Sequence, residues 1–288
     1  MRAPASQPAL RQRREKSRRN RVLANFAAVV VFVVMIFPVY WMVATAFKSG
    51  SAVTSSTPTW VPTHPTLGNF RAAMSQPFFW SSVRNSVIVV VATVSFSAIV
   101  AFLAAVAIAR FKFYGRKAIM VAIIIVQMIP LVALIIPMYV LLARLHLTDN
   151  LFGLILTYFA FVLPYTVWML RGFVLGVPAE LEEAAMVDGC SRIGAFFRIL
   201  VPLVAPGFVA TSIYAAIQAW NEYILAYVLL KQNHETITVW LASLTTLRGT
   251  AWGTLMAGST LIALPIVVFF LVIQHRVADG LTAGAVKG

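Results

Sequence analysis

The chain has 288 residues, of which 60% are hydrophobic and 11% are charged, and its mean hydropathy is +0.86. A soluble domain of this length cannot bury so much apolar surface, so the composition predicts an integral membrane protein. A net charge of +14 would suit nucleic acid, but the basic residues follow a membrane topology and do not gather on one face. The single cysteine, Cys190, excludes an internal disulfide.

The N-terminal residues 1–21 are polar, basic and without apolar periodicity, which predicts a disordered extension at the membrane surface. A signal peptide cleaved after Ala46 is the alternative. The apolar run that follows residue 21 has about 26 residues, which is too long for a signal peptide, so we expect an uncleaved first helix.

Six apolar segments are long enough to cross a bilayer, since about 20 helical residues span its hydrocarbon core. They cover 22–47, 86–109, 118–143, 151–170, 201–230 and 254–273. Continuous runs of this length favour helices over the short alternating strands of a barrel. The predicted fold is therefore all-α and polytopic, with six transmembrane helices within residues 22–275.

The basic residues orient these helices. The N-terminal extension, every second loop and the tail lie on one side of the membrane and together contain 17 Lys and Arg residues. The loops on the other side contain 6. Because cytoplasmic loops carry the excess of basic residues, both termini are expected in the cytoplasm. The long loop 48–85, which contains Pro58, Pro62 and Pro65 and then the sequence Leu67-Gly68-Asn69-Phe70, is expected to fold over the outer face.

Polar residues inside the spans mark a candidate translocation pathway. Glu222 is the one Asp, Glu, Lys or Arg in the six spans, and a carboxylate at membrane depth must face protein or a water-filled interior. In a continuous fifth helix it would lie about 12 Å below the outer end. It either lines the pathway or pairs with another helix, and the same two alternatives apply to Gln127 and Asn221. Trp220 and Tyr223, on either side of Asn221 and Glu222, are further candidates, and the Trp220 ring would stack on a solute. Most of the other tryptophans lie near the expected interfaces, where an aromatic belt explains them.

The cytoplasmic segment 171–203 has the pattern of two short helices joined by a turn. Pro178 suits a first helical turn, and acidic side chains favour the positive end of the helix dipole. Those side chains are Glu180, Glu182 and Glu183. Gly189 then ends the helix, because glycine readily adopts the left-handed conformation. This indicates a coupling helix that docks on another protein, with an ordinary amphipathic loop helix as the alternative.

The spacing within this segment resembles the EAA loop of the permease subunits of ABC importers. Glu183-Ala184-Ala185 is followed by three residues, Gly189, nine residues, Ile199 and Pro202, and Val201 stands where leucine is usual. The resemblance implies that this loop receives the movement of a separate ATPase. The residues it implicates are Glu180, Glu182, Glu183, Ala184, Ala185, Asp188, Gly189, Ile199 and Pro202.

Further motifs extend the resemblance over residues 22–288 to the second permease of maltose or multiple-sugar importers. They are Ala46-Phe47-Lys48, Arg84-Asn85-Ser86, Trp220-Asn221-Glu222-Tyr223, in which Tyr223 replaces the usual phenylalanine, and the closing Gly280–Gly288. The resemblance implies alternating-access uptake of an oligosaccharide or related sugar. It also implies three kinds of partner: a homologous permease, two ATPase subunits and an extracytoplasmic sugar-binding protein.

The tail 276–288 has small residues that suit an extended backbone in a narrow groove, and the resemblance implies a groove between the two ATPase subunits. The residues concerned are Gly280, Leu281, Thr282, Gly284 and Lys287. A frayed terminus is the alternative.

The sequence contains no Gly-Lys dipeptide and hence no Walker A loop, so ATP and Mg²⁺ are expected on the partner ATPase and no cofactor on this chain. The four histidines lack metal-ligand spacing, which argues against a metal site.

A permease for a non-sugar solute is the nearest alternative function. An ion-coupled secondary transporter would normally carry several intramembrane charges, and a membrane enzyme would need a catalytic set that is not evident here.

Overall fold

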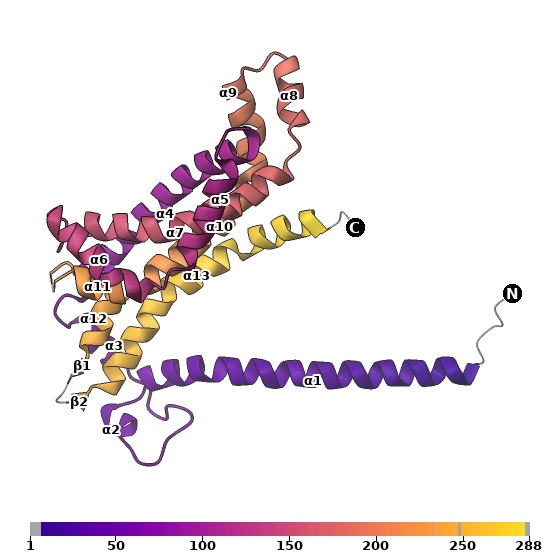
Figure 1. Ribbon diagram of the computed structural model, residues 1–288. Coiled ribbons are helices and arrows are strands. Elements are labelled where there is room, and N and C mark those ends of the chain that lie inside the picture. Colours follow the sequence, from indigo (N-terminus) through magenta and orange to yellow (C-terminus); the bar gives the residue numbers. More distant parts are fainter. Residues whose placement is uncertain (1–6, 232, 247–248, 286–288) are drawn as a thin grey trace. The chain divides into compact units, whose positions relative to one another are not determined.

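The computed structural model describes residues 7–231, 233–246 and 249–285. The chain divides into two units, Met1–Ala73 with Ala251–Thr260, and Met74–Thr250 with Leu261–Gly288. Nearly all of the described regular structure is helical, as the composition predicted (Figure 1).

The first unit is built on α1 (Gln7–Ala46), followed by α2 (Gly50–Val53), α3 (Gly68–Met74) and the first turns of α13 (Trp252–Ala285). Because α1 begins at Gln7, the basic extension continues the first helix and the expected disorder of residues 7–21 is wrong. The extension is rich in Arg, which is a good helix former. Apolar side chains from Val22 to Tyr40 are exposed, so lipid or another protein must cover them.

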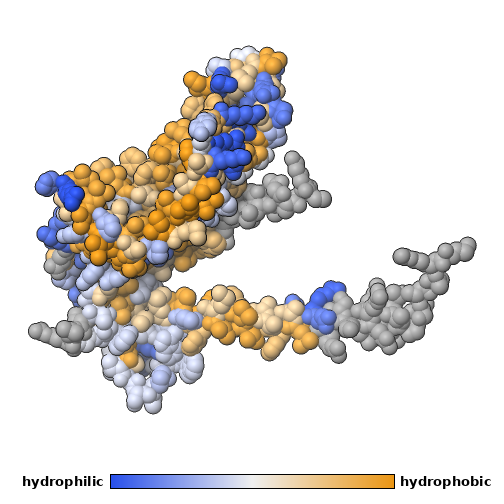
Figure 2. Space-filling view, in the orientation of Figure 1, coloured by the Kyte–Doolittle hydropathy of each residue, from blue (hydrophilic) through white to orange (hydrophobic). Residues whose placement is uncertain are grey.

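The second unit is centred on three long helices, α4 (Phe79–Arg110), α7 (Leu151–Gly176) and α10 (Val201–Asn221). The most extensive helix contact joins α4 to α7, and α10 packs against both. Gly207 brings α10 close to α7, because a Cβ there would lie 2.6 Å from the ring of Phe173. Figure 2 shows apolar residues over much of the visible bundle surface, with hydrophilic residues gathered towards the end that carries the α8–α9 segment.

The third predicted span, 118–143, is not one helix. It divides into α5 (Arg116–Met128) and α6 (Leu131–Arg144), which are bent by 101°. Pro130 explains the break, because it lacks an N–H and holds the preceding Ile129 in an extended conformation.

The fifth predicted span, 201–230, is too long by several residues. After α10 ends at Asn221, Glu222 is extended and a separate α11 (Ile224–Leu229) begins. The chain continues through α12 (Ile237–Ser243) and the antiparallel pair β1 (Thr245–Thr246) and β2 (Gly249–Thr250). The expected position of Glu222, well inside a continuous helix, is therefore wrong.

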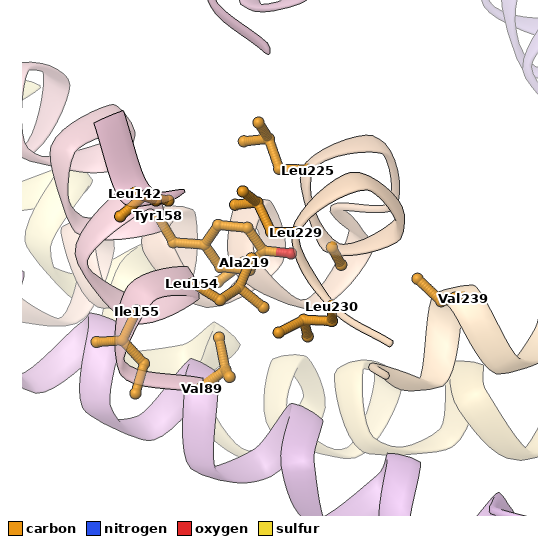
Figure 3. Close-up of a cluster of buried hydrophobic side chains, with 11 residues drawn as sticks. Val89, Leu142, Leu154, Ile155, Tyr158, Ala219, Leu225, Leu229, Leu230 and Val239 are labelled. Atoms are coloured by element: carbon orange, nitrogen blue, oxygen red, sulfur yellow. The ribbon is translucent and has the colours of Figure 1, made fainter. Parts of the chain in front are cut away.

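Five described helices are long and apolar enough to cross a membrane, and the bent α5–α6 pair makes a sixth span if counted as one. This agrees with the six predicted spans. Beside the break after α10, a cluster of buried side chains joins α6, α7 and α11 (Figure 3). The Tyr158 ring reaches from α7 towards α11 within that cluster (Figure 3).

Candidate functional site

A cavity of about 800 Å³ lies in the second unit between α5, α6, α7 and the α10–α11 junction. Both helix breaks contribute to its wall, one at Ile129 and the other at Glu222 and Tyr223. Non-helical backbone at membrane depth is tolerated where it lines a water-filled cavity, because water satisfies the freed N–H and C=O groups. The two breaks therefore place freed backbone groups at the wall of an open cavity.

Polar and aromatic side chains line this cavity against an apolar background. They include four of the five predicted pathway residues, and the full polar and tyrosine set is Gln127, Tyr158, Tyr165, Tyr214, Gln218, Asn221, Glu222 and Tyr223. Amide groups can donate and accept hydrogen bonds, and aromatic rings offer flat apolar faces. Such a lining suits a solute that carries many hydroxyl groups.

Sequence reasoning missed Tyr158, Tyr165, Tyr214 and Gln218, although a signal for them exists. Tyr214 and Gln218 are four residues apart, and Asn221 follows three residues later, so all three lie on one face of α10. Tyr165 of α7 and Tyr214 pack with their ring centroids 4.0 Å apart. A polar stripe on an otherwise apolar helix would have indicated these α10 positions.

Glu222 is held at the break between α10 and α11 by three hydrogen bonds to its carboxylate. Oε1 accepts from the backbone N–H of Leu225 at 2.9 Å, and Oε2 accepts from the N–H of Ala226 at 3.1 Å. The Tyr158 hydroxyl donates to Oε2 at 2.7 Å. Glu222 thus caps the first turn of α11, ties it to α7, and also lies on the cavity wall.

Trp220 is the predicted pathway residue that is not part of the cavity lining. Its side chain is buried, and Nε1 donates to the carbonyl of Ile262 on α13 at 3.2 Å. The indole is therefore packed between helices, and this geometry does not favour the hypothesis that it stacks on a sugar ring.

A helical hairpin occupies residues 178–200, within the predicted coupling loop 171–203. Its elements are α8 (Glu180–Val187), α9 (Arg192–Ala195) and a π-helical turn, η1 (Phe196–Leu200), which leads directly into α10. Gly189 has φ of +92°, the left-handed conformation that the sequence predicted for the turn. Ser191 begins α9 by accepting a hydrogen bond from the N–H of Gly194.

Glu182 forms an ion pair with Arg110 of the same chain, which the sequence did not predict. Arg110, at the end of α4, donates through Nε and Nη2 to Glu182 Oε1 at 2.8 and 2.7 Å. The same guanidinium donates from Nη2 to the carbonyl of Val177 at 2.9 Å. Arg110 therefore joins the bundle both to the segment before α8 and to α8 itself.

The remaining hairpin surface is available to another protein. Glu180, Glu183, Ala184 and Asp188 are exposed, and the three acidic residues among them form no ion pair within the described part of the chain. Ala185 and Ile199 are partly exposed, whereas Pro202 lies in the first turn of α10. Large apolar side chains are exposed beside the acidic ones, namely Leu181, Val187, Ile193 and Phe197. Acidic and apolar groups thus share one projecting surface.

The C-terminal residues follow a different course from the expected one. The backbone of Gly280, Leu281, Thr282 and Gly284 belongs to α13, so the extended conformation is wrong for them. Interspersed alanine and leucine favour the helix. Lys287 lies outside the described residues.

Comparisons with known proteins identify the family. The model of the family described as "binding-protein-dependent transport system inner membrane component" matches residues 98–282, more than half of the chain. The chain belongs to this family. The match includes the cavity and the hairpin, so both belong to the part of the chain that defines a multi-pass inner-membrane permease.

Among the relatives of this permease, DasC of Streptomyces coelicolor, a diacetylchitobiose uptake system permease protein, is 44% identical over 93% of this chain and 98% of its own. The sulfoquinovosyl glycerol transport system permease SmoH of Agrobacterium fabrum is 34% identical over 92% and 94%. The arabinooligosaccharides permease AraQ of Halalkalibacterium halodurans is 33% identical over 91% and 94%.

The fold of the permease is that of a solved importer. A chain from a bacterial ABC transporter involved in the import of the acidic polysaccharide alginate matches with a TM-score of 0.77 and 21% identity, covering 95% of this chain and 99% of the other. This likeness establishes the fold of an ABC importer permease.

Proposed function

We propose that this permease carries an oligosaccharide or a related sugar across the membrane through the cavity between α5, α6, α7 and the α10–α11 junction. The observation that carries the proposal is the set of amide, carboxylate and tyrosine groups at two helix breaks inside an apolar bundle. The cavity volume lies within the range of small-molecule sites, roughly 300–1,000 Å³. The names of DasC, SmoH and AraQ, each an uptake or transport protein for a saccharide or glycoside, support the same solute class.

Individual residues have distinct roles in this proposal. Gln127, Gln218 and Asn221 hydrogen-bond the hydroxyls of the sugar. Tyr165, Tyr214 and Tyr223 offer ring faces to its C–H surfaces. The carboxylate of Glu222 is largely occupied by Tyr158 and α11, so its main role is to hold the junction in place. Gln218 is exposed. Within the described residues its side-chain amide makes one hydrogen bond, from Nε2 to the Tyr214 hydroxyl at 3.5 Å, so it is free to turn towards a solute.

Transport would be coupled to ATP hydrolysis on other subunits. In this proposal the permease pairs with a homologous permease, and two cytoplasmic ATPase copies bind ATP and Mg²⁺, since this chain has no Walker A sequence. An extracytoplasmic binding protein delivers the sugar, and both termini face the cytoplasm. The cavity then opens alternately to the two sides as the bundles move.

The hairpin would transmit that movement. Its acidic and apolar residues project from the bundle, with Glu183 exposed and the apolar Val187 beside it. The ion pair from Arg110 to Glu182 ties the hairpin to the end of α4, so a displacement of α8 is passed to the bundle. The C-terminal residues Gly280–Gly284 and Lys287 would contact the ATPase pair as a second point of communication.

The proposal is tested by reconstituting the complete importer in proteoliposomes with its binding protein. Uptake of labelled diacetylchitobiose, an arabinooligosaccharide and an amino acid is compared with and without internal ATP. We expect ATP-dependent uptake of a saccharide and none of the amino acid. Saccharide uptake should be lost in Glu183→Lys, which reverses the charge of the docking surface. ATP-driven uptake of the amino acid alone would refute the sugar assignment.

A further inference from the structure

The first unit contains a buried lysine that neither the pathway nor the hairpin uses. Lys48 lies two residues beyond the end of α1 and is only 4% exposed. Its ammonium is 4.1 Å from the centroid of the Trp41 ring, close enough for a cation–π interaction. Within the described part of the chain it takes part in no ion pair.

The sequence of this unit offers Lys48 no acidic partner. Glu15 is the single Asp or Glu among residues 1–73 and 251–260, and the α1 helix separates it from Ala46 by about 45 Å at 1.5 Å per residue. Taking an ammonium out of water without an anion is costly, and an aromatic face repays only part of that cost. The site is therefore complete only when a negative group is supplied from outside the unit.

The ammonium borders a cavity of about 320 Å³ that could hold such a group. Thr45 also lines it, and its buried hydroxyl has no hydrogen-bond partner. Ser55 adds a second hydroxyl, which accepts a hydrogen bond from the N–H of Thr57 at 3.2 Å. The rest of the wall is mainly apolar: Trp41, Ala52, Val53, Pro58, Trp252 and Met256. One cation and two hydroxyls in an apolar setting suit an oxyanion attached to an apolar body.

The backbone around Lys48 is held in position by Asn69. The Asn69 amide donates to the carbonyls of Ala46 at 2.9 Å and Lys48 at 2.7 Å. Gly253 of α13 lies against the same amide, because a Cβ there would be 2.5 Å from Asn69 Oδ1. Two sequence motifs, Ala46-Phe47-Lys48 and Leu67-Gly68-Asn69-Phe70, are thus brought together and fix the backbone of Lys48, which lines the cavity.

We propose that this cavity binds the phosphate of an anionic phospholipid headgroup. It lies at the end of α1, whose apolar side chains from Val22 to Tyr40 are exposed, so it is placed where hydrocarbon gives way to headgroups. Trp41 and Trp252 in its wall are typical of that boundary. The ammonium and the hydroxyls bind the phosphate, and the apolar wall contacts the glycerol and the first acyl carbons.

The test uses the purified complete importer in detergent. Native mass spectrometry counts the phosphatidylglycerol molecules retained, and thermal unfolding is followed as phosphatidylglycerol or phosphatidylcholine is added. Lys48→Met should retain one phosphatidylglycerol fewer per chain and lose the stabilisation by this lipid, whereas Lys48→Arg should keep both. Lys112→Met, which removes an exposed charge elsewhere, should behave as the unaltered protein does.

Three outcomes would overturn the proposal. Equal lipid retention by Lys48→Met and the unaltered importer would show that the lysine holds no headgroup. Full Lys48-dependent stabilisation by inorganic phosphate without lipid would show that the site takes a free anion. A Lys48-dependent effect that appears only with the binding protein present would assign the site to an acidic protein side chain. None of these outcomes depends on which solute the importer carries, so the inference stands apart from the proposed function.

Discussion

The Tyr158 hydroxyl donates to Glu222 Oε2 at 2.7 Å and thereby joins the middle of α7 to the break between α10 and α11. Tyr158 is only 2% exposed, and Thr238 of α12 donates to the backbone carbonyl of the same glutamate at 2.7 Å. Glu222 therefore connects α7, α11 and α12 at the cavity wall. The same carboxylate thus makes the structural contacts and also lies on the cavity wall.

Glu222→Leu should destabilise the permease, because it leaves the buried Tyr158 hydroxyl and two N–H groups at the start of α11 without an acceptor. Each buried group left unpaired costs about 1–3 kcal/mol. We expect a lower unfolding temperature of the purified importer and reduced uptake. Glu222→Gln keeps one acceptor oxygen, so its unfolding temperature and uptake should lie between those of Glu222→Leu and the unaltered importer.

A double-mutant cycle with Tyr158→Phe isolates the pair. If the hydrogen bond is as the structure has it, the two substitutions together should destabilise less than the sum of their separate effects. Strict additivity would mean that the two side chains do not interact.

Arg110→Met should loosen the hairpin without unfolding the bundle. The substitution removes the charged hydrogen bonds to Glu182 and to the Val177 carbonyl, each of a kind that contributes about 1.5–3 kcal/mol. Sugar-stimulated ATP hydrolysis by the importer should fall, and hydrogen exchange in residues 178–188 should rise. Lys112→Met, an exposed change two residues later, is the control and should alter neither. An identical effect of both variants would argue against a specific anchor.

Gly189→Ala and Gly172→Ala form a matched pair, because a Cβ at either position would meet no atom within 4 Å. They differ in backbone conformation, since Gly189 has φ of +92° and Gly172 lies within the α7 helix. The left-handed conformation costs a non-glycine residue about 1–2 kcal/mol, whereas alanine favours a helix. Gly189→Ala should therefore impair coupling of ATP hydrolysis to sugar, and Gly172→Ala should not. Equal behaviour would contradict the role assigned to the turn.

Much of this architecture follows from local sequence. The six spans follow from runs of apolar residues, and the hairpin turn follows from Gly189, because both signals depend on neighbouring residues alone. Gln127, Asn221 and Glu222 were found because a polar group inside a span must face an interior, and all three line the cavity.

What the sequence did not predict depends on contacts between distant segments. Arg110 pairs with a residue 72 positions away, and nothing near Arg110 signals that partner. Proline kinks a helix, but Pro130 in the third span does not by itself set the 101° bend, across which α5 contacts α7 and α6 contacts α11. Trp220 lies beside three pathway candidates, yet its direction is fixed by the Ile262 carbonyl on α13.

Asp149→Asn should destabilise the permease in a pH-dependent manner. Burial alone would raise the pKa of Asp149. The hydrogen bonds from His234 and from the Lys231 N–H, together with the charges of both residues, outweigh this effect, so the pKa lies below its ordinary value. A lowered folded-state pKa gives stability that is present above the unfolded-state pKa and is lost as the pH falls through the folded-state pKa. Asparagine tolerates the positive φ of 53° at this position, so the backbone is preserved.

The measurement is thermal unfolding of both proteins across the pH range. The variant should unfold at a lower temperature near pH 7, and the two curves should converge in acid, below the ordinary pKa of an aspartate, about 3.9. A difference that persists unchanged into acid would mean that the aspartate charge is not its source.

The central claim, that the cavity carries the solute, is tested most directly by comparing Tyr214→Ala with Tyr139→Ala. Tyr214 lines the cavity and packs on Tyr165, whereas Tyr139 is exposed on α6 and is not part of the cavity lining. The measurement is ATP-driven uptake of a labelled disaccharide into proteoliposomes as a function of its concentration, at matched amounts of assembled importer. Tyr214→Ala should lower the uptake rate or raise the concentration needed for half-maximal uptake, and Tyr139→Ala should leave both unchanged. Uptake by Tyr214→Ala that equals that of the unaltered importer at every concentration would contradict the account.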